Sequence, residues 1–401
     1  MARARAGAPL VCALAVAAAL VLIAAGCGGG SRESTPRSST LEATFAVFPD
    51  YLDPSLSYSL EGWSAMWETY VPLLTYAHAD GAAGTKVIPG LARALPRITN
   101  GGRTYTLFLR SGLRYSDGTP VRASDFRSTI ERMLAMNSPA TPFYTDIVGA
   151  ERFAKNKKGG IAGIVTDDAS GRIVIHLVEP HSTFTNELAM LFAAPLPPDT
   201  KRKDLSGDPP PGTGPYEIVS SKVGQGWEYR RNPEWAKANG ALLPQIPAGH
   251  YSAIDVRVIS NPETAVNEVM NGKLDWMEEP PPPDRYAEVS KRYEGSQFLA
   301  TPQIDLYYFW MNVHQPPFDS LQVRRAVNDA IDPAALERIY AGLLRPTQQV
   351  LPVAMPGHRT FRLYPHDMAK ARKLIAAADP RERKVTVWTD DYGPNKQAGE
   401  Y

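Results

Sequence analysis

The stretch GRTYTLFLRSGLRYSDGTPVRASDF, residues 102–126, contains three structural signals in succession. Residues 105–110 are mainly aromatic, β-branched and leucine side chains, which favour a strand, and SDGT at 116–119 favours a tight turn. Apolar side chains then recur at helical spacing: Phe126, Ile130, Met133 and Leu134. Ser124 is placed to cap the first turn of that helix. The stretch therefore predicts a strand, a turn and a helix.

Strand-like and helix-like segments continue to alternate along the rest of the chain. Further strands are predicted at residues 172–178, 254–258, 306–312 and 384–389. Further helices are predicted at residues 320–331, 333–341 and 371–378. One more helix should begin at Asn261-Pro262, with proline at its first helical position, and stop at Asn271-Gly272. We therefore expect an α/β architecture.

The N-terminal residues have the pattern of an export signal. Two arginines precede an apolar run over residues 11–25, and small residues lead to Cys27. Residues 1–26 resemble a bacterial lipoprotein signal peptide, although Ala24 stands where leucine is usual. The resemblance implies that Cys27 carries the acyl groups that anchor the protein to a membrane. Residues 27–40 would form a flexible tether. The alternative is that this apolar run is an uncleaved transmembrane anchor. Either a cleaved lipoprotein signal or such an anchor would place the folded domain outside the cytoplasm.

Charge and cysteine content narrow the possible functions. The chain has 43 Lys and Arg against 42 Asp and Glu, a balance that gives no electrostatic signature of nucleic-acid binding. Its two cysteines are Cys12, within the signal, and Cys27. A mature domain without a free cysteine has no disulfide, thiolate metal site or cysteine nucleophile. We therefore expect no nucleic-acid partner and no cysteine chemistry.

The sequence lacks the common catalytic and cofactor motifs. It has no Gly-x-Ser-x-Gly elbow, His-Glu-x-x-His pair, phosphate loop or dinucleotide fingerprint. Residues 212–215, GTGP, favour a turn, and His176 and His181 favour core or surface positions over metal ligation. Glu278-Glu279 could be a glycosidase acid/base pair, but neighbours in a strand face opposite sides. We expect no catalytic residue, metal or cofactor.

Several short blocks occur in the order typical of one family. They are PGLA at 89–92, residues 102–120 with ASDF at 123–126, GTGPY at 212–216, RNPEW at 231–235, GKLDW at 272–276, and Asn312 with PPFD at 316–319 and VRRA at 323–326. In this order the chain resembles the extracytoplasmic solute-binding proteins of family 5, which deliver peptides, nickel and related solutes to ABC importers. No single block is specific, but together they extend through most of the mature chain.

The resemblance implies a two-lobed, type II-like periplasmic-binding-protein fold with an inserted subdomain. Residues 41–75 and 212–305 would form lobe I, with the inserted subdomain at 76–211. Residues 306–401 would form the hinge and part of lobe II. The lobes of such proteins close on solute by hinge bending.

Family members continue well past the strand predicted at 384–389, so the resemblance implies a C-terminally truncated chain with an incomplete second lobe. In peptide-binding members an aspartate late in lobe II pairs with the peptide's amino terminus, and its position would lie beyond residue 401. Asp390 and Asp391 are instead predicted to be the polar end of a strand. An incomplete lobe would leave apolar surface exposed, so we expect residues 41–401 to aggregate or to bind solute weakly.

A cleft that binds solute needs aromatic walls and a few convergent polar groups. Tyr51 follows the first predicted strand, and Trp63 lies four residues before Trp67 on one helical face. In the strand predicted at 306–312, one face should line the cleft and the other should be core. The candidate substrate-binding residues are Tyr51, Trp63, Tyr307, Tyr308, Trp310 and Asn312. Burial in a core is the alternative role for these aromatic side chains.

These features together predict a lipid-anchored, monomeric binding protein on the outer side of the cell membrane. It would capture a peptide or a similar small solute between two lobes, and the closed form would be recognised by an ABC permease and ATPase complex. Two alternatives remain open: a ligand-binding receptor that signals to a membrane sensor, and a secreted hydrolase.

Overall fold

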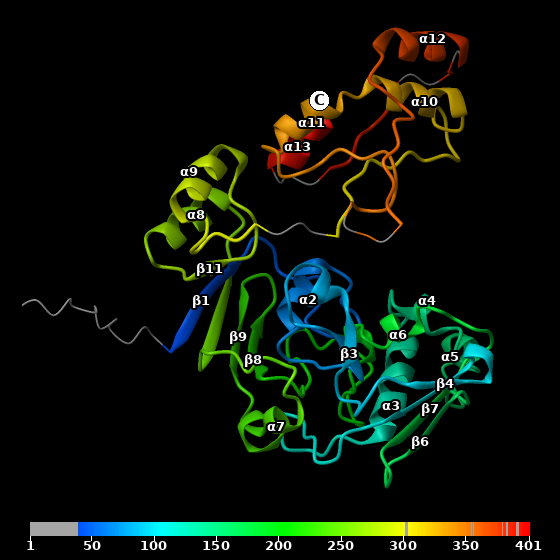
Figure 1. Cartoon of the computed structure of the whole chain (residues 1–401), viewed down its shortest axis with the longest axis vertical. Helices are drawn as coiled ribbons and strands as arrows, with labels where there is room; N and C mark the ends of the chain where they lie inside the picture. The colour runs from blue at the N-terminus through cyan, green and yellow to red at the C-terminus, as the bar shows by residue number, and fades with distance from the viewer. Residues whose placement is uncertain are drawn as a thin grey trace, which may run out of the picture. The chain divides into compact units, whose positions relative to one another are not determined.

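The computed structural model describes residues 39–300, 304–353, 355, 357–378, 380–381, 384–389 and 393–401 (Figure 1). The chain divides into two compact units after Ser39. The described helices and strands belong to the second unit, Thr40–Tyr401. The predicted signal peptide, Cys27 and nearly all of the tether lie outside the described residues, as do Asp390 and Asp391. Among the described helices, none has the length and apolarity required to cross a bilayer.

The first sheet has five strands in the order β11-β1-β10-β9-β8. Their bounds are β1 Thr40–Phe45, β8 Tyr216–Lys222, β9 Gly226–Arg231, β10 Ala253–Val258 and β11 Trp276–Met277. β1 runs parallel to β10 and β11, whereas β8, β9 and β10 pair antiparallel. The strand predicted at 254–258 is confirmed, and Ile254, Val256 and Val258 share the face that packs into the core of this sheet.

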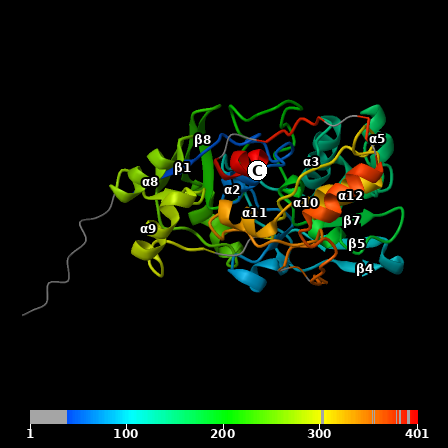
Figure 2. The ribbon, with the colours of Figure 1, turned by 90° about the horizontal axis from the view of Figure 1, so that it is seen from above.

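The second sheet has four antiparallel strands in the order β4-β5-β7-β6. Their bounds are β4 Arg97–Thr99, β5 Thr104–Phe108, β6 Ile164–Asp167 and β7 Arg172–His176. α3 (Ala123–Ala135) and α5 (Ala150–Asn156) lie on one side of it (Figures 1 and 2). Tyr105 and Leu107 are buried in the core of this sheet, whereas Phe108 is exposed. The strand, turn and helix predicted from residues 102–126 are confirmed.

The remaining elements up to residue 293 are short helices and a third, two-stranded sheet of β2 and β3. They are α2 Leu60–Met66, β2 Leu74–Tyr76, η1 Gly81–Thr85, β3 Val87–Pro89, η2 Asn100–Gly102, α4 Thr141–Tyr144, α6 Phe184–Glu187, η3 Leu191–Ala193, η4 Trp235–Asn239, α7 Gly240–Leu242, α8 Pro262–Met270 and α9 Pro283–Tyr293. Asn261 caps α8 by accepting a hydrogen bond from the Thr264 amide at 2.9 Å, and the helix ends before Asn271-Gly272 as predicted.

The predicted cap of α3 is wrong in detail. The helix begins at Ala123, one residue before Ser124, so Ser124 lies inside the first turn. Its hydroxyl donates a hydrogen bond to Asp168 at 2.8 Å, and the Asp125 carboxylate accepts one from the Arg122 amide at 2.8 Å. Asp125 therefore takes the capping role that we expected of Ser124.

Residues 213–215 form a bend where we predicted a turn, and close approach of another segment requires glycine at positions 212 and 214. A Cβ at Gly212 would overlap the Thr69 carbonyl oxygen, and a Cβ at Gly214 would overlap the Glu68 carbonyl oxygen. The Gly214 amide donates to Thr69 at 2.9 Å, which holds the bend against the residues after α2. A side chain at either glycine would separate these two segments.

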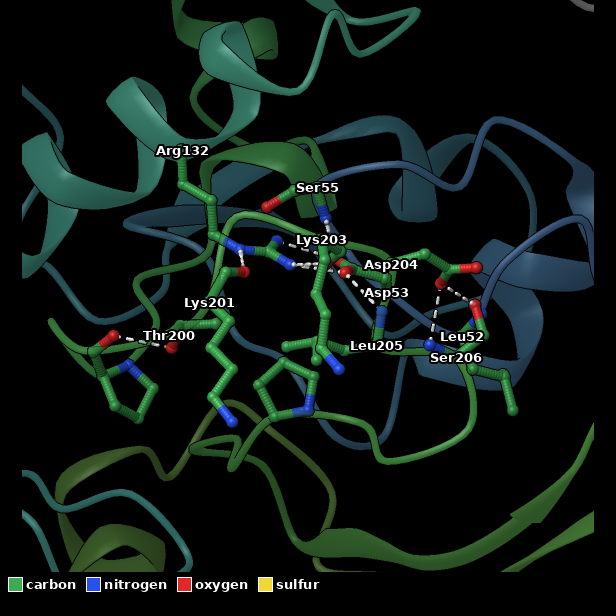
Figure 3. Close-up of polar contacts among 12 residues, drawn as sticks. Leu52, Asp53, Ser55, Arg132, Thr200, Lys201, Lys203, Asp204, Leu205 and Ser206 are labelled. Atoms are coloured by element: carbon green, nitrogen blue, oxygen red, sulfur yellow. Dashed lines mark hydrogen bonds and ion pairs between the residues drawn. The ribbon is translucent and has the colours of Figure 1, made fainter.

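A buried ion pair connects the loop after β1 to α3 (Figure 3). The Arg132 guanidinium donates to both carboxylate oxygens of Asp53, at 2.8 and 2.6 Å, and the two side chains are 3% and 0% exposed. Arg132 also donates to the carbonyls of Lys201 and Lys203, both at 2.8 Å. Asp53 in turn accepts from the Leu205 amide. Three segments far apart in the sequence are thereby fixed to one another.

The C-terminal segment contains four helices within the residues that the structure describes there: α10 Leu321–Ala330, α11 Pro333–Ile339, α12 Met368–Ala378 and α13 Gly393–Glu400. The first three confirm the predictions, and α13 was not predicted. Lys370 on α12 pairs at 3.0 Å with the fully buried carboxylate of Asp329 on α10.

Two predicted strands in this segment are wrong. Residues 306–312 and 384–389 have no strand structure, and their aromatic side chains are exposed: Trp310 by 82% and Trp388 by 89%. A β-rich composition produces a strand only where a neighbouring strand accepts its backbone hydrogen bonds. The sheets of the described residues take all their strands from residues 40–277.

We predict that Arg132→Met lowers the free energy of unfolding by about 3–5 kcal/mol, because the buried Asp53 carboxylate would lose its ion-pair partner. Urea denaturation of the full chain followed by circular dichroism measures this loss. Lys155→Met, which removes an exposed ion pair with Glu151, is the control and should cause a much smaller loss. Equal losses in the two variants would contradict the role assigned to the buried pair.

Burial raises the pKa of Glu68, which follows α2, to about 7. A carboxyl group with a raised pKa in the folded state destabilises the fold as pH rises from about 4.5 through 7. Glu68→Gln should therefore leave stability unchanged near pH 4.5 and raise it by about 1–3 kcal/mol at pH 8. Denaturation midpoints across this pH range, with exposed Glu337→Gln as control, measure the effect. A variant with the pH dependence of the wild type would contradict the assignment.

Candidate functional site

The carboxyl ends of β1, β10 and β11 meet at one edge of the five-stranded sheet, because the three strands are parallel. Ligands of open α/β sheets commonly bind outside this edge. The chain leaves β1 at Ala46 and β10 at Ile259, and it leaves β11 at Glu278. The Glu278 amide donates to Thr44 at 3.0 Å, and the Ile259 amide donates to Phe45 at 2.9 Å. We call this region the carboxyl edge.

Glu278 and Glu279 lie at the carboxyl edge, and Glu61 on α2 is near enough to raise the pKa of both. Glu279 accepts a hydrogen bond from the Ala46 amide at 2.7 Å. Burial raises the pKa of Glu278 to about 7, and repulsion from Glu279 and Glu61 adds to the shift. Burial also raises the pKa of Glu279, with a contribution from Glu61. Within the described residues, no ion pair neutralises any of the three, so a bound cation would relieve their repulsion.

The two adjacent glutamates do not follow the rule that we applied to them in the sequence. β11 ends at Met277, so Glu278 and Glu279 lie after the strand and not within it. Their carboxylates therefore need not face opposite sides of the sheet, and both respond to Glu61 on α2. The sequence offered one signal of this site, the acidic pair Glu278-Glu279. The sequence alone could not show that Glu61, more than 200 residues earlier, lies near this pair.

The loop between β1 and α2 is organised by Asp50. Its carboxylate accepts from the Ser57 hydroxyl and the Tyr58 amide, both at 2.7 Å, and from Ser59. Tyr51, one of the predicted site residues, is half-buried in this loop, and its amide donates to Asp50 at 2.8 Å. The same loop exposes Tyr58, which the sequence did not single out: 57% of its surface is accessible.

Trp63 packs against the cores of both the four-stranded and the five-stranded sheet. This is the core role that we gave as the alternative to solute binding. Its indole nitrogen donates to the Ser57 carbonyl at 3.0 Å, and its ring meets Phe192 edge-on at 5.5 Å. The ring of Tyr58 stacks near that of Phe192, with centroids 6.2 Å apart. Contact between Trp63 and a solute stays a prediction.

The remaining predicted site residues lie in the C-terminal segment. The rings of Tyr308 and Trp310 are 5.4 Å apart, and Tyr307 lies 6.4 Å from Tyr340. Asn312 accepts a hydrogen bond from the His314 amide at 3.1 Å. Neither face of residues 306–312 is core, because Tyr307 and Tyr308 from opposite predicted faces are both exposed, by 62% and 59%. The expectation that one face is buried is therefore wrong.

The histidines singled out in the sequence have local partners. Both ring nitrogens of His181 lie near carboxylates, at 3.0 Å from Asp146 and 3.1 Å from Glu187. His176 lies 3.3 Å from the Thr104 hydroxyl. In the part of the chain that the structure describes, no group of three or more His, Cys, Asp or Glu side chains could hold a metal ion.

Comparisons with known proteins agree with the order of the sequence blocks. The family model of the bacterial extracellular solute-binding proteins, family 5 (middle region), matches residues 86–401. The glutathione-binding protein GsiB of Escherichia coli O1:K1 is 28% identical over 296 residues, which cover 73% of this chain and 53% of GsiB. The chain thus spans about half the length of this curated relative.

Solved structures show the same fold. The clavulanic acid biosynthesis oligopeptide binding protein 2 superposes with a TM-score of 0.69 at 26% identity, covering 85% of this chain and 64% of the other. OppA of Haemophilus influenzae, in complex with the peptide RPPGFSPFR, gives a TM-score of 0.69 at 21% identity, with coverages of 85% and 67%. The α/β fold is therefore that of the type II periplasmic binding proteins, and the chain belongs to the bacterial extracellular solute-binding proteins of family 5.

Proposed function

We propose that this chain is an extracytoplasmic, lipid-anchored binding protein that captures a peptide or a similar small solute and delivers it to an ABC importer. The observation that carries the proposal is the carboxyl edge, where Glu61, Glu278 and Glu279 gather without an ion-pair partner among the described residues. Such an edge favours binding of a solute that carries a positive charge. Membership of a family of solute-binding proteins supports the same role.

An ammonium group is the cation that best fits these carboxylates. Glutathione and oligopeptides, after which the relatives described above are named, both carry a free amino group. An ammonium group can donate three hydrogen bonds, and bonds between charged groups contribute about 1.5–3 kcal/mol. We therefore propose that the amino group of the solute binds between Glu278 and Glu279, and not to the lobe II aspartate that the family resemblance implies.

The exposed aromatic residues of the C-terminal segment supply the second part of the proposed site. Residues 41–75 and 212–305 would form lobe I, 76–211 its inserted subdomain, and 306–401 the hinge and part of lobe II. Solute contacted from both lobes would shift the population toward the closed form, which the permease recognises. Tyr308 and Trp310 would then lose exposure as apolar walls around the solute. The cycle requires binding and release but no bond-making step.

We predict that this chain binds tetra-alanine more tightly than N-acetyl tetra-alanine, because acetylation removes the ammonium charge. Glu278→Gln with Glu279→Gln should weaken binding of tetra-alanine by about 10–100-fold, the loss of one charged hydrogen-bonded interaction. Isothermal titration calorimetry measures both effects. Glu288→Gln with Glu294→Gln, which changes as much charge on and after α9, should leave the affinity unchanged. Equal affinities for the free and the acetylated peptide would contradict the proposed site.

Affinity should also rise with pH from 5.5 to 7.5. Glu278, with its pKa of about 7, is mostly protonated at the lower end and gains its charge toward the upper end, whereas the peptide's ammonium keeps its charge. A Glu278→Gln variant should lose this rise. Calorimetric titrations with tetra-alanine across the same pH series test the prediction, and a flat wild-type profile would contradict it.

We predict that Cys27→Ser releases the protein from the membrane. Acyl chains on Cys27 would provide the stable attachment, since each buried methylene contributes about 0.8 kcal/mol. Metabolic labelling with a palmitate analogue and fractionation of membranes measure attachment in the wild type and the variant. An unchanged membrane fraction in Cys27→Ser would contradict the lipid anchor and favour an uncleaved transmembrane segment.

A further inference from the structure

A hollow of about 280 Å³ lies at one edge of the four-stranded sheet, between β5 and the segment that leads into β4. The Arg93 amide donates to the Phe108 carbonyl at 2.8 Å, and Arg97 pairs with Thr106 in the strand register. Residues 94–96, between these two contacts, have no strand structure. The hollow therefore forms where the edge segment leaves the sheet and rejoins it. We call it the edge hollow.

The lining of the edge hollow is apolar and accessible. Leu95 and Phe108 line it and are 53% and 42% exposed. Phe108 lies on the outer face of the sheet, since Tyr105 and Leu107 are buried on the face toward α3. The edge hollow therefore offers apolar contact to a group that enters from solvent.

The charged side chains that line the edge hollow are all basic. Arg93 and Arg97 line it, and no lining residue is acidic. Hydrogen bonding from the Arg93 Nε to the Leu109 carbonyl, at 3.0 Å, holds this guanidinium in place. Arg172, exposed on β7, lies opposite Phe108 in the register, but Asp167 on β6 lies opposite Arg172 and partly offsets its charge. A group that complements this surface has an apolar side chain next to carboxylates.

The position of the edge hollow indicates which kind of partner enters it. Sites for free small molecules usually cover most of the ligand. The edge hollow, of about 280 Å³, opens on the outer face of a sheet and suits one or two side chains of another protein. Arginine is also enriched among the residues that contribute most to protein interfaces.

We propose that the edge hollow binds an acidic extracytoplasmic segment of the importer's membrane subunit, with an apolar side chain of that segment seated between Leu95 and Phe108. The inference rests on the proposed function, because it assigns the partner to an importer. The contact is separate from solute capture, which uses the carboxyl edge of the other sheet.

A photocrosslinking amino acid at Leu95, introduced into the full chain in membranes that contain the importer, tests the partner directly. We expect a crosslink to the membrane subunit, on a peptide with Asp or Glu beside an apolar residue. A crosslink to a second copy of this chain would overturn the proposal, and so would the absence of any crosslink from Leu95 in a protein that still binds tetra-alanine.

Charge reversal separates this contact from solute binding. Arg93→Glu with Arg97→Glu should raise at least tenfold the protein concentration needed for half-maximal stimulation of the importer's ATPase in proteoliposomes. The affinity for tetra-alanine should stay within twofold. Arg97→Glu alone, which leaves the Arg93 hydrogen bond to Leu109 intact, should show the same direction of change.

Arg152→Glu with Lys158→Glu, an equal charge change at exposed positions on and after α5, is the control and should alter neither quantity. Unchanged ATPase stimulation by the edge-hollow variants would overturn the inference while leaving solute capture intact. A wild-type protein that binds tetra-alanine but does not stimulate the importer would overturn it as well. Failure of the wild type to bind tetra-alanine would instead count against the proposed solute site.

Discussion

The buried pair of Asp53 and Arg132 is the constraint on which the position of the carboxyl edge depends. It joins the loop that follows β1 to α3 on the second sheet, and the carbonyls of Lys201 and Lys203 complete its hydrogen bonding. A buried ion pair is stable only when the remaining donors and acceptors of both side chains also form hydrogen bonds. We therefore infer that this pair favours one arrangement of the loop after β1, α3 and residues 201–205. Trp63, packed against both cores, and the bend at 212–215 hold the same region from other directions.

With these segments fixed, the carboxyl edge can hold carboxylates that repel one another. Asp50 holds the loop that begins α2, which brings Glu61 toward Glu278 and Glu279. Burial of Glu278 raises its pKa, and repulsion from Glu279 and Glu61 adds to the shift. A site that is unfavourable when empty gains free energy when a cation enters, and this is the basis on which we assign it to the ammonium group of a solute.

Much of the fold could be predicted from the sequence, because residues 102–126, the strand at 254–258 and the helix after Asn261 carry strong local signals that packing reinforces. Residues 306–312 and 384–389 show the limit of such signals, since their composition favours strands but pairing depends on neighbours far along the chain. The site was less predictable. Glu61 and Glu278 are separated by more than half the chain, and only the parallel pairing of β1 with β11 brings their segments together.

The pKa of Glu278, measured by NMR of the carboxyl carbon in the full chain with and without saturating tetra-alanine, tests the central claim most directly. The account predicts a value of about 7 in the free protein and a clear decrease when the peptide binds, because an ammonium group stabilises the charged carboxylate. A pKa that is unchanged by bound peptide would show that the solute's amino group binds elsewhere and would contradict the account.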